Sequence, residues 1–185
     1  MNNFSHRPVM HGLCVALLVL LGACSVSIPA DQTNTMHKPT PQKIGPFPAF
    51  SGRLIVINPS RRWQVEIDWQ AYQPNAGKLR LNHAFSSTIV DFRWNNSHME
   101  IRDNKFPYWR DIQQKELTEH GIMLPPNQLA SILLGNIPSS FHQKKTDTWE
   151  SKQSGSLIRL LWQPELKKLT ISDIQHGRVA KLIIH

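Results

Sequence analysis

Apolar and polar residues alternate along much of the chain beyond residue 50, and this pattern predicts a sheet with one buried face. From Trp63 to Gln70 every second residue is apolar, and a period of two is the repeat of a half-buried strand. Short turn sequences such as Asn58-Pro59-Ser60 separate the alternating runs, so consecutive strands should pair as antiparallel neighbours. The pattern places five such strands at residues 52–57, 63–70, 79–82, 90–94 and 99–102.

The pattern changes to a helical period in the middle of the chain. Residues 111–120 fit a short polar helix. A second segment, residues 126–138, places Leu129, Ile132 and Leu133 on one face, because residues three and four positions apart lie on the same side of a helix. Such a helix must pack its apolar face on another apolar surface.

Three further strands are predicted at residues 157–162, 166–172 and 179–184, after a polar loop that extends to about Ser154. Leu182-Ile183-Ile184 is apolar at successive positions, which is typical of a strand covered on both faces. We therefore expect an α+β fold: one strongly curved antiparallel sheet, with the helices inserted midway and packed over its concave apolar face.

The composition is that of a small, basic protein. The chain of 185 residues suits one domain, and its 40% apolar content supports one hydrophobic core. A formal net charge of +8 favours contact with anionic surfaces, such as phospholipid headgroups or an acidic partner protein. The basic residues are dispersed and no predicted helix carries a basic stripe, so we do not expect nucleic-acid binding.

The N-terminal residues have the order of features found in an export signal. Arg7 supplies positive charge, residues 13–21 are apolar, and small residues precede Cys24. The apolar run is shorter than the roughly 20 residues that span a bilayer. Residues 21–24, Leu-Gly-Ala-Cys, resemble the bacterial lipobox, which implies that a signal peptide of residues 1–23 is removed and that Cys24 carries a lipid. The alternative is an ordinary secretory signal in which Cys24 is incidental.

The residue after Cys24 is Ser25 rather than Asp, and by resemblance to the sorting pattern of Gram-negative lipoproteins this implies the periplasmic face of the outer membrane. Residues 24–48 are rich in Pro, Thr, Gln, Asn and Ser, which predicts an extended tether between the lipid and a folded body of residues 49–185. The only cysteines, Cys14 and Cys24, precede that body, so it contains no disulfide or thiolate catalyst.

One large aromatic residue, Phe85, lies in the otherwise small and polar connection between the third and fourth predicted strands. Turns favour small and polar residues, and an exposed Phe leaves about 1.5–3 kcal/mol of burial free energy unrealised. Phe85 is therefore covered either by its own sheet or by another phase such as a lipid bilayer.

No motif for catalysis or metal binding is recognisable. The chain lacks Gly-x-Ser-x-Gly, a phosphate-binding glycine run and paired metal-ligand spacing. Its nine histidines occur singly, and only His83, two residues before Phe85, is near a candidate site. We therefore expect neither an enzyme nor a cofactor or metal ion.

Four segments of the body resemble the LolB family of outer-membrane lipoprotein receptors, in the order 52–69, 81–92, 126–138 and 178–184. The resemblance implies an unclosed β-barrel whose apolar interior is lidded by helices. It also implies that the protein accepts lipoproteins from a LolA-like periplasmic carrier and inserts them into the outer membrane. Phe85 falls on the position of a protruding leucine that the family needs to place its cargo in the membrane.

The chain departs from the family pattern in both candidate segments. His83-Ala84-Phe85-Ser86 replaces the Pro and Gly that shape the family's loop. Ile132 stands where the family commonly has Trp. These differences bear on how far Phe85 protrudes and on the contacts of the helical lid.

We therefore predict a monomeric, non-enzymatic receptor that transiently holds the acyl chains of cargo lipoproteins in an apolar cavity, while Phe85 inserts into outer-membrane phospholipid. The alternatives are an accessory envelope lipoprotein that binds a protein partner through its sheet face, and an envelope hydrolase, for which the sequence supplies no convergent polar groups. An open apolar cavity favours the receptor, and a filled concave face favours the accessory protein. The candidate lining residues, each equally explained as simple core, are Trp63, Val65, Ile67, Trp69, Leu79, Leu81, Val90, Phe92, Met99, Ile101, Leu129, Ile132 and Leu133.

Overall fold

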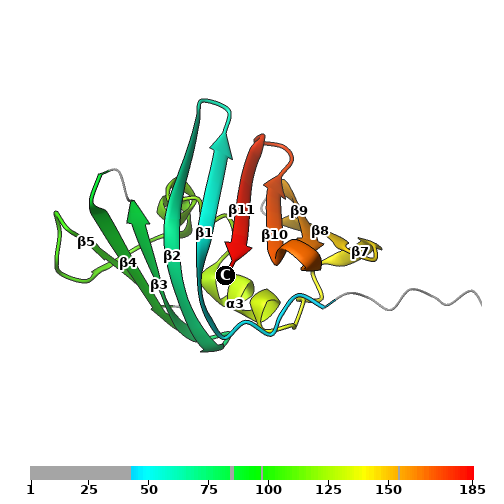
Figure 1. The fold of residues 1–185 in the computed structure, drawn as a ribbon, viewed down its shortest axis with the longest axis horizontal. Coiled ribbons are helices and arrows are strands. Elements are labelled where there is room, and N and C mark those ends of the chain that lie inside the picture. The colour runs from blue at the N-terminus through cyan, green and yellow to red at the C-terminus, as the bar shows by residue number, and fades with distance from the viewer. Residues whose placement is uncertain (1–42, 84–85, 97, 154) are drawn as a thin grey trace, which may run out of the picture. The chain divides into compact units, whose positions relative to one another are not determined.

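The computed structural model describes residues 43–83, 86–96, 98–153 and 155–185. The predicted signal peptide, most of the predicted tether, Cys24 and Phe85 lie outside these residues. Within them, eleven antiparallel strands form one sheet in the order β6-β5-β4-β3-β2-β1-β11-β10-β9-β8-β7 (Figure 1). The two edges of this sheet are β6 and β7, so it is not closed into a barrel.

The sheet consists of two meanders that meet where β1 pairs with β11. The first contains β1 (Ala49–Asn58), β2 (Arg61–Gln73), β3 (Ala76–His83), β4 (Thr88–Asn95), β5 (His98–Asp103) and β6 (Arg110–Asp111). The second contains β7 (His142–Lys145), β8 (Thr148–Gln153), β9 (Ser156–Gln163), β10 (Lys168–Asp173) and β11 (Arg178–Ile184), with a short 3-10 helix η1 (Pro164–Leu166) between β9 and β10. Leu54 of β1 lies opposite Leu182 of β11, so the two meanders share one continuous inner face.

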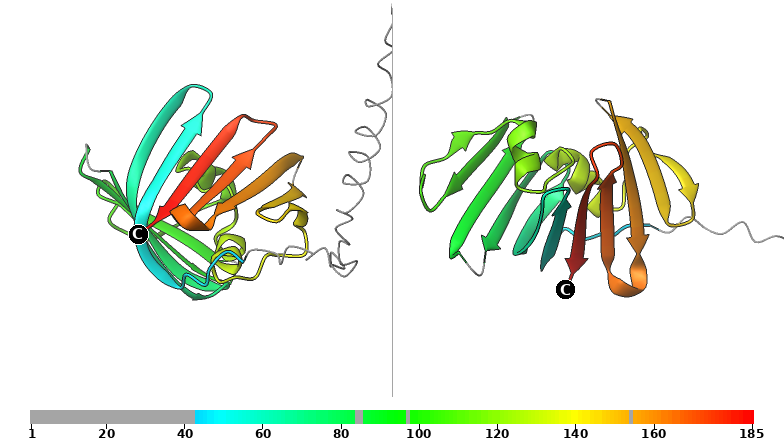
Figure 2. Two further views of the ribbon diagram at one scale, coloured as in Figure 1. Left: turned by 45° about the vertical axis from the view of Figure 1, so that its right-hand side comes forward. Right: turned by 90° about the horizontal axis from the view of Figure 1, so that it is seen from above.

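The two helices connect the meanders. They are α2 (Gln114–Glu119) and α3 (Pro126–Leu133), and both lie on the same side of the sheet (Figure 2). Four of the eight residues of α3 are buried apolar side chains and a fifth is the buried Pro126. The prediction of a large antiparallel sheet with few helices is therefore confirmed.

The predicted polar loop before Ser154 is wrong, because it contains β7 and β8. Every residue of β7 is exposed, and in β8 the buried Trp149 is the only large apolar residue. A hydrophobic alternation was therefore absent from this segment. The exposed Lys144 and Lys145 suit an edge strand, because charge discourages pairing with a second chain.

Two helix boundaries and the burial of one strand also differ from the sequence pattern. The helix expected at residues 111–120 begins only at Gln114, because Arg110 and Asp111 pair with β5 as strand β6. Helix α3 ends at Leu133 rather than near residue 138. In β11 the outward Ile183 is only half-buried, beside Arg53 and Lys168 of the neighbouring strands, so this strand is not fully covered on both faces.

Residues 43–48, at the end of the predicted tether, pack against the body. Ile44 is completely buried, and the Phe47 N–H donates to the Leu133 carbonyl oxygen at 2.7 Å. This bond satisfies one of the carbonyl groups that a helix leaves unpaired at its C-terminal end. Gly45 has a φ of +90, and a Cβ atom there would clash with the same carbonyl oxygen, so only glycine fits the close approach.

We predict that Ile44→Ala reduces the free energy of unfolding by about 2–5 kcal/mol, because it leaves a cavity in the core. The measurement is equilibrium urea unfolding followed by tryptophan fluorescence. Ile174→Ala, at a side chain that is 44% exposed, is the matched control and should change stability by less than about 1 kcal/mol. Equal small effects at the two positions would mean that residues 43–48 are not part of the folded body.

Candidate functional site

The candidate site is the inner face of the first meander together with the helix that lies on it. The strand registers place the inward side chains in rows that run across the sheet. Trp69 of β2 lies opposite Leu79, and Leu79 lies opposite Phe92 of β4. Ile67 and Leu81 form part of a second row. Alternation along each strand therefore gives one continuous apolar surface.

An enclosed cavity of about 30 Å³ lies between this surface and the chain segment that contains α3. Leu129 of α3 lines the cavity from one side, and Ile67 and Leu79 line it from the sheet. The remaining lining residues are Leu54, Trp69, Gly121, Ile122, Met123, Ile171, Ala180 and Leu182.

The size of this cavity means that the inner face is largely filled. About 30 Å³ is enough for roughly one water molecule, whereas pockets that hold drug-sized ligands measure roughly 300–1,000 Å³. Ile132 and Leu133 of α3 are completely buried and occupy part of the interior. The cavity as it stands is therefore too small for an acyl chain.

The structure places the candidate lining residues in three groups. Ile67, Trp69, Leu79 and Leu129 line the cavity. Val65, Leu81, Val90, Phe92, Ile101, Ile132 and Leu133 are buried in the surrounding core. Trp63 and Met99 are only partly buried and pack against that core. Their role as a lipid-binding surface stays a prediction.

Sequence reasoning missed the contribution of the second meander to the cavity. Ile171, Ala180 and Leu182 face it. In β11, apolar residues at successive positions conceal which face of the strand is buried. For Ile171 the signal was present in β10, where the buried Leu169 and Ile171 alternate with polar residues. Pairing β1 with the last strand would have brought Leu182 beside Leu54.

Four buried polar side-chain atoms have no hydrogen-bond partner among the described residues. They are Nε1 of Trp63, Nε1 of Trp69, Oε1 of Gln114 and Oε1 of Gln128. An unpaired buried donor or acceptor costs about 1–3 kcal/mol. Trp69 also lines the apolar cavity.

Two histidines pack on aromatic rings close to the interior. His83, the last residue of β3, stacks on Trp63 with ring centroids 5.5 Å apart. His120, which follows α2, meets Phe92 edge to face at 5.4 Å. Burial lowers the pKa of both imidazoles, and for His120 it outweighs the opposing effect of Glu116 and Glu119. Burial thus favours the neutral form of both rings.

The connection from α2 to α3 depends on Gly121. Its φ is +82, in the left-handed region, and a Cβ atom there would clash with Val56 Cγ2. The same Cβ would lie 3.3 Å from the ring of Trp63. Because Gly121 also lines the cavity, this position sets how closely the connection approaches the sheet.

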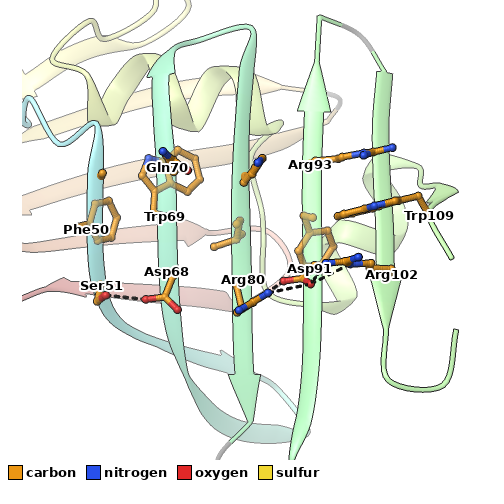
Figure 3. Close-up of a pocket in the computed structure, with 14 residues that line it drawn as sticks. Phe50, Ser51, Asp68, Trp69, Gln70, Arg80, Asp91, Arg93, Arg102 and Trp109 are labelled. Atoms are coloured by element: carbon orange, nitrogen blue, oxygen red, sulfur yellow. Dashed lines mark hydrogen bonds and ion pairs between the residues drawn. The ribbon is translucent and has the colours of Figure 1, made fainter. Parts of the chain in front are cut away.

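A larger depression, of about 760 Å³, lies on the opposite, outer face of the first meander (Figure 3). Arg80 Nε donates to Asp91 Oδ1 at 2.7 Å, and Arg102 Nη2 lies 3.0 Å from Asp91 Oδ2. Burial alone would raise the pKa of Asp91, but the hydrogen bonds from Arg80 and Arg102 lower it overall. On this outer face Asp91 is therefore paired with both Arg80 and Arg102.

In the part of the chain that the structure describes, no helix is long and apolar enough to cross a membrane. The same residues contain no group of three or more His, Cys, Asp or Glu side chains placed to hold a metal ion.

Comparison with protein families finds a match for the chain. The family model described as "Outer membrane lipoprotein LolB" matches residues 49–172. This is more than half of the chain, and it spans the first meander, both helices and most of the second meander. No curated protein sequence matches the chain.

We predict that the free energy of unfolding falls as the pH is lowered from about 7 to about 5. The unfolded histidines titrate near 6.5, and the pKa of His120 and of His83 is lower in the folded protein, so the unfolded state binds more protons in this window. Urea unfolding at a series of pH values measures the slope of the free energy of unfolding against pH. His120→Gln should reduce it, whereas His142→Gln, at an exposed position of β7, should not. An unchanged slope in His120→Gln would contradict this assignment.

We also predict that Gly121→Ala is more destabilising than Gly155→Ala. Both glycines have a φ near +80, but a Cβ at Gly155 meets nothing within 4 Å. Gly155→Ala should therefore cost only the backbone strain of about 1–2 kcal/mol, and Gly121→Ala should cost about 1–3 kcal/mol more because it also overpacks Val56. Thermal and urea unfolding measure the difference in the free energy of unfolding. Equal destabilisation by the two substitutions would show that the connection between α2 and α3 is not packed closely against the sheet.

Proposed function

Because the chain belongs to the LolB family, we propose that it accepts lipoproteins from a LolA-like periplasmic carrier and inserts them into the outer membrane. Family membership makes it a lipid-anchored outer-membrane lipoprotein that faces the periplasm and has a receptor role in lipoprotein localisation. The family is one of transport and lipid-binding proteins rather than of enzymes. The proposal concerns how this chain carries out that role.

The observation that carries the proposal is the enclosed apolar cavity between α3 and the inner face of the sheet. We propose that α3 is a lid and that the acyl chains of the cargo replace it on that face. The strands are held to one another by continuous backbone ladders, whereas α3 has only eight residues and lies between two connecting segments. Local opening is expected where few backbone bonds must break, so the helix moves and the sheet stays fixed.

The transfer needs no cofactor and no energy source in this account. Each buried CH₂ group of an acyl chain contributes about 0.8 kcal/mol, and this gain offsets the exposure of Leu129, Ile132 and Leu133 when the lid opens. The Trp69 indole N–H, which has no partner in the closed form, is the proposed donor to a carbonyl group at the head of an acyl chain. Release follows when the bilayer buries the chains better than the cavity does.

The lipid anchor and the insertion loop complete the proposal. Cys24 is the proposed lipid attachment site, and Phe85 is the proposed residue that enters outer-membrane phospholipid. The residues that follow Phe85 support a turn, because the Ser86 N–H donates to the His83 carbonyl oxygen at 3.1 Å and Ser87 has a φ of 50. The left-handed residue is therefore Ser87, one position after Ser86, which stands in place of the family's glycine. The working unit is proposed to be a monomer that meets the carrier, the cargo lipoprotein and the bilayer in turn.

One observation favours the accessory-lipoprotein alternative. The inner face is nearly filled, while the larger depression of about 760 Å³ lies on the outer face. A protein partner that bound there would leave α3 in place. The receptor proposal and this alternative therefore differ in whether the inner face ever opens.

We predict that carrier loaded with fluorescently labelled lipoprotein passes its label to the mature chain, and that Phe85→Glu accepts the label but delivers it to liposomes at least about tenfold more slowly. The reason is that a charged side chain loses the burial of Phe in the bilayer, about 1.5–3 kcal/mol. Label in each component is measured after size-exclusion separation. Tyr72→Glu changes an aromatic residue that is 69% exposed and is the matched control.

Failure of the unaltered chain to take up label would contradict the receptor proposal. Normal delivery by Phe85→Glu would contradict only the insertion role of that residue.

A further inference from the structure

The connection between β5 and β6 carries two highly exposed aromatic side chains. Phe106 is 61% exposed and Tyr108 is 83% exposed, and Lys105 and Pro107 adjoin them. We propose that residues 105–108, named here the aromatic tip, form a second bilayer-contact surface that enters the headgroup region of the membrane to which the protein is anchored. The proposal rests on the membrane anchoring of the family and requires neither cargo binding nor a role for Phe85.

The N-terminal side of the aromatic tip is fixed by Asp103. Its Oδ1 atom accepts hydrogen bonds from the backbone N–H groups of Lys105 and Phe106, each at 2.8 Å. The Asp103 N–H donates in turn to the Phe106 carbonyl oxygen at 3.0 Å. These bonds form a tight turn of the kind that Asp stabilises through its own side chain. The backbone conformation of this turn thus leaves the Phe106 side chain exposed.

The C-terminal side of the aromatic tip is fixed by Trp109. The Arg93 guanidinium lies 4.3 Å from the centroid of the indole ring, and that of Arg102 lies 4.6 Å from it. Cation–π contacts of this length hold the indole on the outer face of β4 and β5. Phe106 and Tyr108 lie between these two fixed ends, so their side chains are held exposed to solvent and do not pack on the sheet.

The aromatic tip lies next to the turn that follows β3. The Asn104 side chain donates to the Ser87 carbonyl oxygen at 2.9 Å and accepts from the Ile89 N–H at 3.0 Å. Ile89, itself 37% exposed, and Pro107 line one shallow depression. Three of the six exposed large hydrophobic side chains of the described residues, Ile89, Phe106 and Tyr108, therefore belong to this corner.

The chemistry of the tip fits a bilayer interface better than a protein groove. Phe supplies an apolar ring, Tyr combines an apolar body with a polar hydroxyl, and Lys pairs with anionic headgroups; this is the composition of interfacial membrane segments. The two aromatic side chains of the tip are exposed, and the depression beside them at Pro107 is shallow. A lipid anchor also keeps the bilayer at a high effective concentration beside the protein, so even weak contacts are occupied.

The test measures membrane depth in the full lipidated protein in liposomes, without carrier or cargo. Phe106→Cys and Tyr108→Cys are labelled with bimane, and Tyr72→Cys is the control. Tyr72 is 69% exposed and lies near the β2–β3 turn, at the other end of β2 and β3 from the β3–β4 turn. We expect doxyl groups placed near the headgroups to quench the label at 106 and 108 at least about threefold more than at 72, because interfacial side chains enter the headgroup boundary.

Two results would overturn the proposal. One is equal quenching at positions 72, 106 and 108. The other is that the labels at 106 and 108 become shielded from solvent only when carrier is added in the absence of liposomes. That result would make the tip a protein-binding surface. Because the measurement involves no transfer, a failed transfer assay would remove the receptor function and leave this result unaffected.

Discussion

The packing of α3 on the inner face of the sheet is the contact on which the rest of the structure depends. The interior has room for roughly one water molecule, so it can be filled by the apolar side of α3 or by a ligand, but not by both. In the proposed mechanism, Leu129, Ile132 and Leu133 are buried on the same surface that an acyl chain would occupy. Binding would then be an exchange, in which the cargo replaces the free energy that closes the empty protein.

The same helix is connected to the chain segment that leads to the membrane. Phe47 bonds to the Leu133 carbonyl oxygen, and Ile44 is buried in the core. The end of the predicted tether is thus attached to the C-terminal end of α3. In the proposed mechanism, displacement of α3 must break or carry along this attachment. The proposed bilayer contact at the β5–β6 connection lies on a different element, so it does not depend on the position of α3.

The sequence was informative wherever one face of a strand is buried and the other solvated. In β2, Val65, Ile67 and Trp69 alternate with exposed polar residues, and the predicted strand matches the observed one in its central part. The same reasoning failed for β7, which buries nothing, and for β8, because Trp149 is its one large apolar residue. It gave the candidate inner-face residues of the first meander but not Leu182, because a strand with apolar residues on both faces has no period to read. It also missed Ile171, although Leu169 and Ile171 alternate with polar residues in β10. The volume left in the interior depends on how α3 packs against particular side chains. The periodicity of the sequence does not report that packing.

The most direct test of the account is to find where an acyl chain binds. A cargo lipoprotein whose acyl chains carry a photoreactive diazirine would be transferred to the protein, irradiated, and the adducts located by mass spectrometry. The account predicts adducts on inner-face residues such as Ile67 and Leu79 and on Leu129 of the lid. Adducts confined to the outer-face depression, at residues such as Lys78 and Arg80, would contradict it.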